Sequence, residues 1–133
     1  MAEIKRLNPE SGWIEFPLEE NGLLSPPVFR CRLRLTTKFD MMDARDDVPV
    51  DQKDSEMILG TALGLIVDWD LTDGGVKIPC TDEAKKEPGL ALFLRALLST
   101  PTQVLSEANP PEGPWLCTAI MVKAREPEAF LKN

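Results

Sequence analysis

The side chain best placed for covalent chemistry is the thiol of Cys80. It directly precedes Thr81, a residue suited to cap a helix, and the partial positive charge of a helix N-terminus favours a thiolate. A cysteine nucleophile also requires an activating base, and the chain has no histidine and no tyrosine. We therefore interpret Cys31, Cys80 and Cys117 as reduced thiols that fill space in the core, and we expect no catalytic residue.

Aspartates between residues 68 and 73 are the best candidates for binding a metal ion. Asp68, Asp70 and Asp73 have a spacing similar to that of a calcium loop, and a glycine follows the last of them. With Asp68 at position 1 of such a loop, however, position 6 is Asp73 instead of glycine and position 12 is Pro79 instead of glutamate. The isolated cysteines do not complete the four ligands of a zinc site. We expect solvated carboxylates at a turn, with no metal and no cofactor.

Arginines form the most concentrated positive feature of the chain. Arg30, Arg32 and Arg34 occupy alternate positions and would share one face of a strand, where an acidic peptide or a phosphate could bind. The outward face of a strand is ordinarily charged, and carboxylates on neighbouring strands or solvent can satisfy it. We favour this second interpretation.

Methionines and tryptophans could serve either an interface or the core. Met41, Met42 and Met57 could form an adaptable peptide-binding surface, because methionine repacks easily around different partners. We favour core filling for these methionines. Trp69 and Trp115 suit an interface and a core equally well.

The chain is expected to consist of an arm and one domain. Residues 1–27 are rich in proline and glycine, which leaves room only for a short extended piece around Trp13 to Phe16, so we interpret them as an extended arm lying on the domain. Residues 28–133 are expected to form a single globular α+β domain, a small antiparallel sheet packed against two to four helices. Apolar and arginine side chains alternate strictly over Val28 to Leu35, which predicts a half-buried strand.

Two longer helices are predicted from apolar residues at helical spacing. One runs from about residue 52 to about residue 67, with Asp51 as its N-cap. The other runs near residues 88–98, where Pro88 suits the first helical position. The apolar positions of this second helix are Leu90, Phe93, Leu94, Leu97 and Leu98.

Shorter elements are expected elsewhere. Asp73-Gly74-Gly75 provides two residues that accept positive φ, which predicts a tight reversal between two short extended segments, and Thr81 can cap the helix that follows. Short helices are expected near Thr37 to Ala44 and from Thr100 to about Ala108. Apolar residues on both faces leave Trp115 to Val122 open to strand or helix, and we favour a strand.

Gly60 and Gly64 lie four positions apart in the first predicted helix. Each costs roughly 1 kcal/mol relative to alanine in a helix interior, which a protein tolerates where a neighbouring backbone must approach closely. The two glycines should therefore face a packed element or a partner. Trp69 continues the apolar spacing of the same helix.

Composition excludes several classes of function. The length of 133 residues suits one ordinary domain, and 43% hydrophobic with 28% charged residues is typical of a globular chain. The net charge of −7 argues against binding to nucleic acid, which requires clustered lysine and arginine. The longest apolar run, Met57 to Val67, is about half of the ~20 residues that span a bilayer, and no secretory signal is evident. We expect no nucleic-acid or membrane partner and a cytoplasmic location.

The order of motifs between Met57 and Leu98 is distinctive: an apolar helix leads into a Trp-Asp pair, an acidic glycine turn, an apolar-proline step, a threonine cap and further helices. The residues that carry it are Gly64-Leu65-Ile66-Val67-Asp68-Trp69-Asp70, Asp73-Gly74-Gly75-Val76-Lys77-Ile78-Pro79, Thr81-Asp82-Glu83 and Pro88-Gly89-Leu90. This segment, about a third of the chain, resembles the tail assembly chaperones of long-tailed bacteriophages and prophages.

The resemblance implies a non-enzymatic, oligomerising protein that covers the tape measure protein in the bacterial host cytoplasm before the tail tube polymerises around it. An acidic chaperone with an apolar groove could cover the apolar stripes of such a client helix and keep the complex soluble by charge repulsion. We hypothesise that the face carrying Gly60, Gly64 and Trp69 contributes to self-assembly or to client binding.

Two other classes of function remain open. A small acidic immunity-type or inhibitor-type protein that binds a basic partner protein would share the negative charge and the lack of catalytic residues. A cysteine enzyme using Cys80 would instead show rapid alkylation of that thiol at neutral pH. The phage chaperone is the function that we favour.

Overall fold

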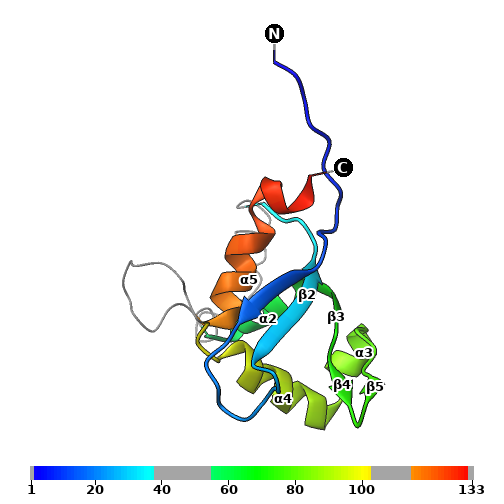
Figure 1. Ribbon diagram of the computed structural model, residues 1–133, viewed down its shortest axis with the longest axis vertical. Coiled ribbons are helices and arrows are strands. Elements are labelled where there is room, and N and C mark those ends of the chain that lie inside the picture. Colours follow the sequence, from blue (N-terminus) through cyan, green and yellow to red (C-terminus); the bar gives the residue numbers. More distant parts are fainter. Residues whose placement is uncertain (1, 38–54, 103–114, 132–133) are drawn as a thin grey trace.

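Three stretches of the chain carry the fold. The computed structural model describes residues 2–37, 55–102 and 115–131, which are coloured in Figure 1. Their elements in chain order are β1 (Ile14–Pro17), β2 (Val28–Leu33), α2 (Ser55–Leu65), β3 (Ile66–Trp69), β4 (Thr72–Asp73), β5 (Val76–Lys77), α3 (Asp82–Lys85), α4 (Pro88–Leu98), α5 (Leu116–Ala124) and the 3-10 helix η2 (Pro127–Phe130). The expected α+β class is confirmed, since a small antiparallel sheet and several helices form one small domain.

The three-stranded sheet has the order β1-β2-β3, with both pairs antiparallel. The alternation of β2 decides which face is buried: Phe29, Cys31 and Leu33 have no exposed surface, and the arginines between them lie on the opposite face. The register places Phe16 of β1 opposite Phe29 and Trp69 of β3 opposite Cys31, so all three strands supply the same apolar face. The strand predicted in this part of the chain is confirmed.

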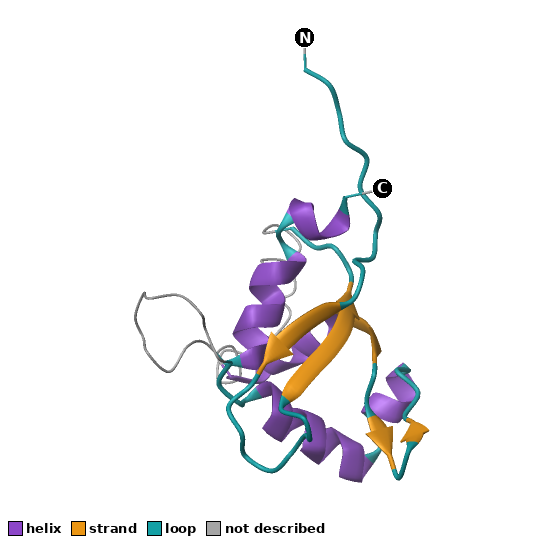
Figure 2. Ribbon diagram, viewed as in Figure 1, coloured by secondary structure: helices purple, strands orange, loops and turns teal. Residues whose placement is uncertain are grey.

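Helices α2, α4 and α5 pack together over the core. α2 contacts both α5 and α4, and α4 also contacts α5. Figure 2 shows α2 crossing behind the strands, with the other two helices next to it. Leu94, Leu97 and Leu98 of α4 are buried, which confirms the second predicted helix and its apolar spacing. The core therefore lies between one face of the sheet and these three helices.

The tight reversal at Gly74 and Gly75 and the helix cap at Thr81, both predicted from the sequence, are also confirmed. Gly74 and Gly75 have φ values of 59° and 83° and join β4 to β5 in a two-stranded hairpin. The Thr81 hydroxyl accepts a hydrogen bond from the Ala84 amide at 3.1 Å and so caps α3. The carboxylate of Glu87 accepts two amide hydrogen bonds, at 3.2 and 2.8 Å, from the first turn of α4.

The segment before β2 contributes to the sheet and to the core. Its extended piece is β1, and Phe16 and Leu18 are buried. Ser11 binds β2 twice: its amide donates to the Leu33 carbonyl, and its hydroxyl oxygen accepts from the Leu33 amide, both at 2.9 Å. Residues 8–18 are thus attached to the rest of the fold by backbone hydrogen bonds and by apolar burial.

The first predicted helix ends earlier than expected. α2 stops at Leu65, whereas the prediction extended it to about residue 67, and Ile66–Trp69 forms β3 instead. The apolar spacing continues through this boundary, so it does not mark the change. Pairing with β2, which aligns Ile66 with Leu33, decides it, and β-branched Ile66 and Val67 suit a strand.

The strand favoured over Trp115 to Val122 is wrong, because this segment belongs to helix α5. The helix buries one face, and Ala119 and Met121 beside it are also partly buried against the core, so apolar residues extend around much of the helix and blur its period in the sequence. Its buried residues are Leu116, Cys117, Ile120 and Ala124. This spacing fits a helix whose buried face packs against the domain, where α5 contacts α2, α4 and the 3-10 helix η2.

Other predicted elements fall partly or wholly outside the described residues. Pro101 and Thr102 form extended bridges to Trp115 and Leu18, so the helix predicted from Thr100 does not begin there, and residues 103–114 are not described. The helix predicted near residues 37–44 lies outside the described part from residue 38 onward. The methionine pair at residues 41–42 lies outside it as well.

Candidate functional site

Carboxylates surround the arginine stripe of β2. Arg30 Nε lies 3.3 Å from Glu15 Oε1 on the neighbouring strand, and Arg30 Nη1 lies 3.7 Å from Asp70 Oδ2. Arg32 Nη2 lies 3.5 Å from Glu10 Oε1, and the third arginine donates to a backbone carbonyl of α2. Each exposed ion pair stabilises the fold by only ~0–1 kcal/mol. Together, these contacts give each of the three guanidinium groups a partner within the fold. The interpretation of this stripe as a charged outward strand face is confirmed.

The three thiols lie in environments that disfavour the thiolate. Cys31 and Cys117 are buried and Cys80 is half-buried, and none forms a disulfide. Burial raises the pKa of all three thiols. For Cys80 the ammonium of Lys85 opposes this effect without overcoming it, and that ammonium donates to two backbone carbonyls, at 2.8 and 3.0 Å. The geometry offers Cys80 no activation as a nucleophile.

The aspartates around the Trp-Asp motif are separated from one another. Asp68 lies 3.0 Å from the Lys77 ammonium and accepts the amide hydrogen bond of the next residue, while Asp70 faces Arg30. Asp73 is exposed on the hairpin and has no ion pair with any described residue. Within residues 2–37, 55–102 and 115–131, no group of three His, Cys, Asp or Glu side chains could hold a metal ion.

The structure separates the three candidate interaction residues into two environments. Gly60 and Gly64 lie exposed on α2, and a Cβ built on either one would meet nothing within 4 Å. The carbonyl of Gly64 accepts the 3.4 Å hydrogen bond from Arg34. Trp69 is fully buried in β3, where its indole Nε1 donates to the Ile78 carbonyl at 2.8 Å. Only the glycines are therefore on the surface.

An apolar groove of about 420 Å³ lies between α2 and α4. Leu59, Gly60 and Leu63 form its α2 side. The α4 side consists of Pro88, Ala91, Leu92, Leu94, Arg95 and Leu98. Leu92 is 71% exposed, so the groove has an apolar rim as well as an apolar floor. Gly60 has no Cβ, so the α2 wall of the groove is open at this position. Gly60 is also one of the three interaction residues hypothesised from the sequence.

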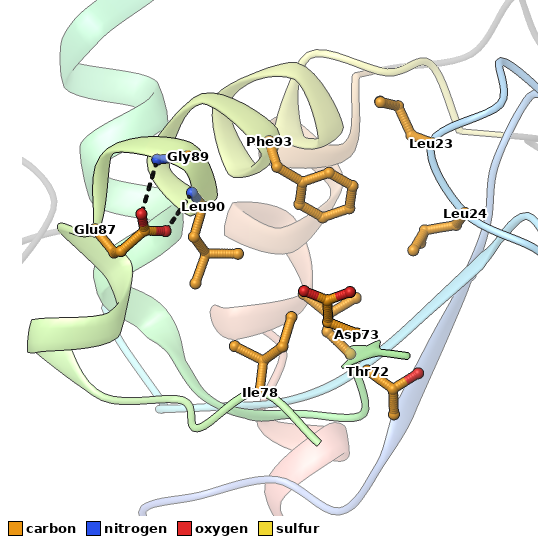
Figure 3. A pocket seen from close by; sticks show the side chains of 10 residues that line it. Leu23, Leu24, Thr72, Asp73, Ile78, Glu87, Gly89, Leu90 and Phe93 are labelled. Atoms are coloured by element: carbon orange, nitrogen blue, oxygen red, sulfur yellow. Dashed lines mark hydrogen bonds between the residues drawn. The ribbon is translucent and has the colours of Figure 1, made fainter. Parts of the chain in front are cut away.

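A second pocket, of about 480 Å³, lies where the β4–β5 hairpin meets the start of α4 (Figure 3). Leu71, Ile78, Leu90 and Phe93 supply most of its apolar wall. Figure 3 shows the side chains of Ile78, Leu90 and Phe93 turned toward a common space, with the loop of Leu23 and Leu24 across from them. The pocket can therefore receive an apolar side chain.

Charge at the mouth of this pocket is negative. Among the described residues, its lining includes the carboxylates of Asp73 and Glu87 and no lysine or arginine. Glu87 caps α4, so the helix N-terminus offsets part of its charge, whereas Asp73 has no such partner. An apolar floor beside an unpaired carboxylate suits an apolar side chain that is followed by a basic one.

Neither hollow follows from the sequence pattern alone. The pocket unites the loop at Leu23 and Leu24 with the hairpin and with α4, segments that are distant in the chain. The one available signal was the large apolar residue Leu92 on the polar side of the α4 pattern, since an exposed leucine in such a position is a weak sign of an interaction surface.

Comparisons with protein-family models, with curated proteins and with solved structures found no match to this chain. None of the helices in the described stretches is long and apolar enough to cross a membrane. The candidate site is therefore defined by geometry: an apolar groove on α2 and α4, and an apolar pocket with an acidic mouth beside the hairpin.

Proposed function

We propose that this protein is a non-enzymatic phage or prophage tail assembly chaperone that oligomerises and covers the tape measure protein during tail assembly. The resemblance over residues 57–98 supports the proposal, and the elements expected there include the hairpin, the capped helix α3 and the core helix α4. No thiol in the described residues is activated, which agrees with a role based on contact.

The observation that carries the proposal is the apolar groove between α2 and α4. Its lining is dominated by leucine, alanine, glycine and proline, and Leu92 projects from its edge with 71% of its surface exposed. A helix-in-groove contact uses apolar residues at i, i+3, i+4 and i+7 of the bound helix. A long helical client with such a stripe would bury it here and lose its tendency to aggregate.

The charge of the chain suits the same task. A net charge of −7 keeps copies that coat one client soluble, because coated particles repel each other at low ionic strength. Contacts at the groove would supply affinity through apolar burial, at roughly 25 cal/mol per Å² before the cost of association is subtracted. Shielding and solubility would thus come from different parts of the surface.

Co-expression with the tape measure protein tests the proposal. We expect the tagged chain to retain the soluble client on an affinity column, and Gly60→Gln to reduce the retained client several-fold because its side chain would extend over the groove. Gly64→Gln is the matched control, since Gly64 lies on the same helix, is also exposed and does not line the groove. A client that stays insoluble or unbound with the parent chain would refute the chaperone function.

The acidic mouth of the hairpin pocket favours a second candidate, a small immunity-type or inhibitor-type protein that binds a basic partner protein. This function predicts stoichiometric binding of a basic enzyme encoded beside this chain, and loss of that enzyme's activity in the complex. Inhibition without any retention of a tape measure protein would favour this candidate over the chaperone.

A further inference from the structure

The first residues of the chain form a short arm that projects from the body. Figure 1 shows this arm leaving the molecule at one end, while α4, β4 and β5 lie at the other. Its backbone is last fastened where Asn8 donates to the Phe130 carbonyl at 2.7 Å and Leu7 bridges Leu131. No hydrogen bond or ion pair joins residues 2–6 to the rest of the described chain.

The chemistry of this arm complements the hairpin pocket. Ile4 is 75% exposed and is followed by Lys5 and Arg6, both exposed. An isoleucine with three-quarters of its surface in water gains free energy when it is buried against other apolar side chains. The pocket at the other end of the molecule offers an apolar floor and the unpaired carboxylate of Asp73.

The arm of one molecule does not reach the hairpin pocket of the same molecule. Residues 2–6 in extended form reach at most roughly 3.3–3.6 Å per residue, and the chain is held at Asn8. Residues of β4 and of the start of α4 line the pocket, and these elements lie at the end of the molecule opposite the arm (Figure 1). An arm could therefore reach this pocket only on another copy.

We propose that residues 2–6 of one copy dock into the hairpin pocket of a second copy, with Ile4 on the apolar floor and Lys5 and Arg6 beside Asp73 and Glu87. This contact supplies the self-association on which the proposed chaperone function depends. It joins two different surfaces, so it is heterologous and can extend to further copies along a line. The contact leaves the α2–α4 groove of every copy free for a client.

The size of the contact sets its strength. An arm of five residues in a pocket of about 480 Å³ gives an interface below the ~1,200 Å² of stable complexes. Association is therefore weak for two free copies and becomes effective when copies are aligned on one client. Assembly of the protein alone is expected only at high protein concentration.

Charge reversal tests the contact on the purified full chain without client. Sedimentation velocity over a concentration series should show assembly of the parent. Lys5→Glu with Arg6→Glu, and separately Asp73→Lys, should each weaken the apparent association constant at least about tenfold, which corresponds to about 1.4 kcal/mol. An equimolar mixture of the two variants should assemble again, because the native arm meets the native pocket and the reversed arm meets the reversed pocket.

Because the chain has a net charge of −7, the direction in which Asp73→Lys changes the association is informative. Asp73→Lys changes the charge from −7 to −5, which lowers the general repulsion between copies and by itself favours assembly. Glu128→Lys causes the same change at an exposed position outside the pocket and is the matched control, with circular dichroism to verify folding of every variant. Glu128→Lys should assemble at least as well as the parent.

Each alternative result overturns the proposal. A parent chain that stays monomeric at every concentration, an Asp73→Lys variant that assembles like the parent, or a mixture that does not recover would all rule out this contact. The result is distinct from failure of the chaperone function, which is read from client retention and not from assembly of the protein alone. Assembly that survives in all arm variants would leave the chaperone proposal intact and assign self-association to another surface.

Discussion

At the scale of single residues, Trp69 connects the sheet to the hairpin. It is fully buried in β3 opposite Cys31 of β2, and its indole nitrogen donates to the Ile78 carbonyl just after β5. The Ile78 amide in turn donates to the Leu71 carbonyl at 2.9 Å. One side chain thus fills the core and fixes the direction in which the hairpin leaves it.

Trp69→Phe should destabilise the protein by roughly 1–3 kcal/mol, because the smaller ring leaves a cavity and the Ile78 carbonyl loses its donor. Urea unfolding followed by circular dichroism measures this change. Trp115→Phe is the control, since Trp115 is 55% exposed and its replacement should change stability by less than about 0.5 kcal/mol. Equal unfolding midpoints for the two variants would contradict the assigned role of Trp69.

Cys31 should make the protein less stable at alkaline pH. Burial, followed by the nearby Cys80 and Asp70, raises the pKa of the Cys31 thiol. The unfolded chain releases this proton above a pH of about 8.5, whereas the folded chain keeps it, so deprotonation favours unfolding. Stability from this group is complete below that pH and falls as the pH rises.

Unfolding by urea between pH 7 and 9.5, with a reducing agent present, tests this expectation. Cys31→Ala should lower stability at pH 7 because it leaves a cavity, and should flatten the alkaline decline by up to about 1.4 kcal/mol per pH unit. Cys80 and Cys117, whose pKa values burial also raises, would account for the decline that remains. Identical slopes for parent and variant would show that the Cys31 thiol ionises as freely in the folded chain as in the unfolded one.

At the scale of elements, glycine has opposite roles in α2 and in the hairpin. Gly60 lies within a helix, with open space where a Cβ would be. Gly75 also has open space around it, but its φ of 83° is a backbone conformation that side chains with a Cβ rarely adopt. The hairpin thus requires its glycine for folding, whereas α2 does not.

Gly60→Ala should stabilise the protein by about 0.5–1 kcal/mol, because alanine has less conformational freedom to lose when the helix forms. Gly75→Ala should destabilise it by roughly 1–2 kcal/mol, because of strain at positive φ. Thermal unfolding of the two variants beside the parent measures both changes. If Gly60→Ala lowered stability, the glycine would be required for packing within the fold and not for an open groove.

At the scale of the whole molecule, the segment before β2 packs into the same core as the helices. β1 pairs with β2 along four residue positions, and Phe16 and Leu18 are buried in the core. Without this segment the central strand would become an edge strand with unpaired backbone groups. The arm of residues 2–6, in contrast, has no hydrogen bond to the described body.

Truncation should separate these two parts. Removing residues 1–27 should lower the unfolding temperature by more than about 10 °C or prevent cooperative unfolding, because it removes a strand and two core side chains. Removing residues 2–6 should leave the unfolding temperature within about 2 °C of the parent. Thermal scans by circular dichroism provide the measurement. A chain of residues 28–133 that unfolded like the parent would place the domain boundary at residue 27, as the sequence alone predicts.

Local sequence determined the parts of this fold whose signals lie within one element. The apolar–arginine alternation from Phe29 to Leu33 defines β2, the leucines of α4 define its buried face, and Gly74 with Gly75 defines the hairpin. Each depends on a backbone period or a φ value that neighbouring residues specify by themselves. The pairing of the β2 arginines with carboxylates likewise follows from the charged outward face of a strand.

Tertiary contacts decided the rest. Ile66 to Trp69 continues the apolar spacing of a helix and becomes a strand where β2 offers it a partner. The apolar face of α5 is buried as a helix against α2, α4 and η2. The groove and the acidic pocket lie between elements that are far apart in the chain, so no local sequence pattern predicts them. Local periods depend on short-range sterics, whereas strand partners and surface hollows exist only after distant segments pack together.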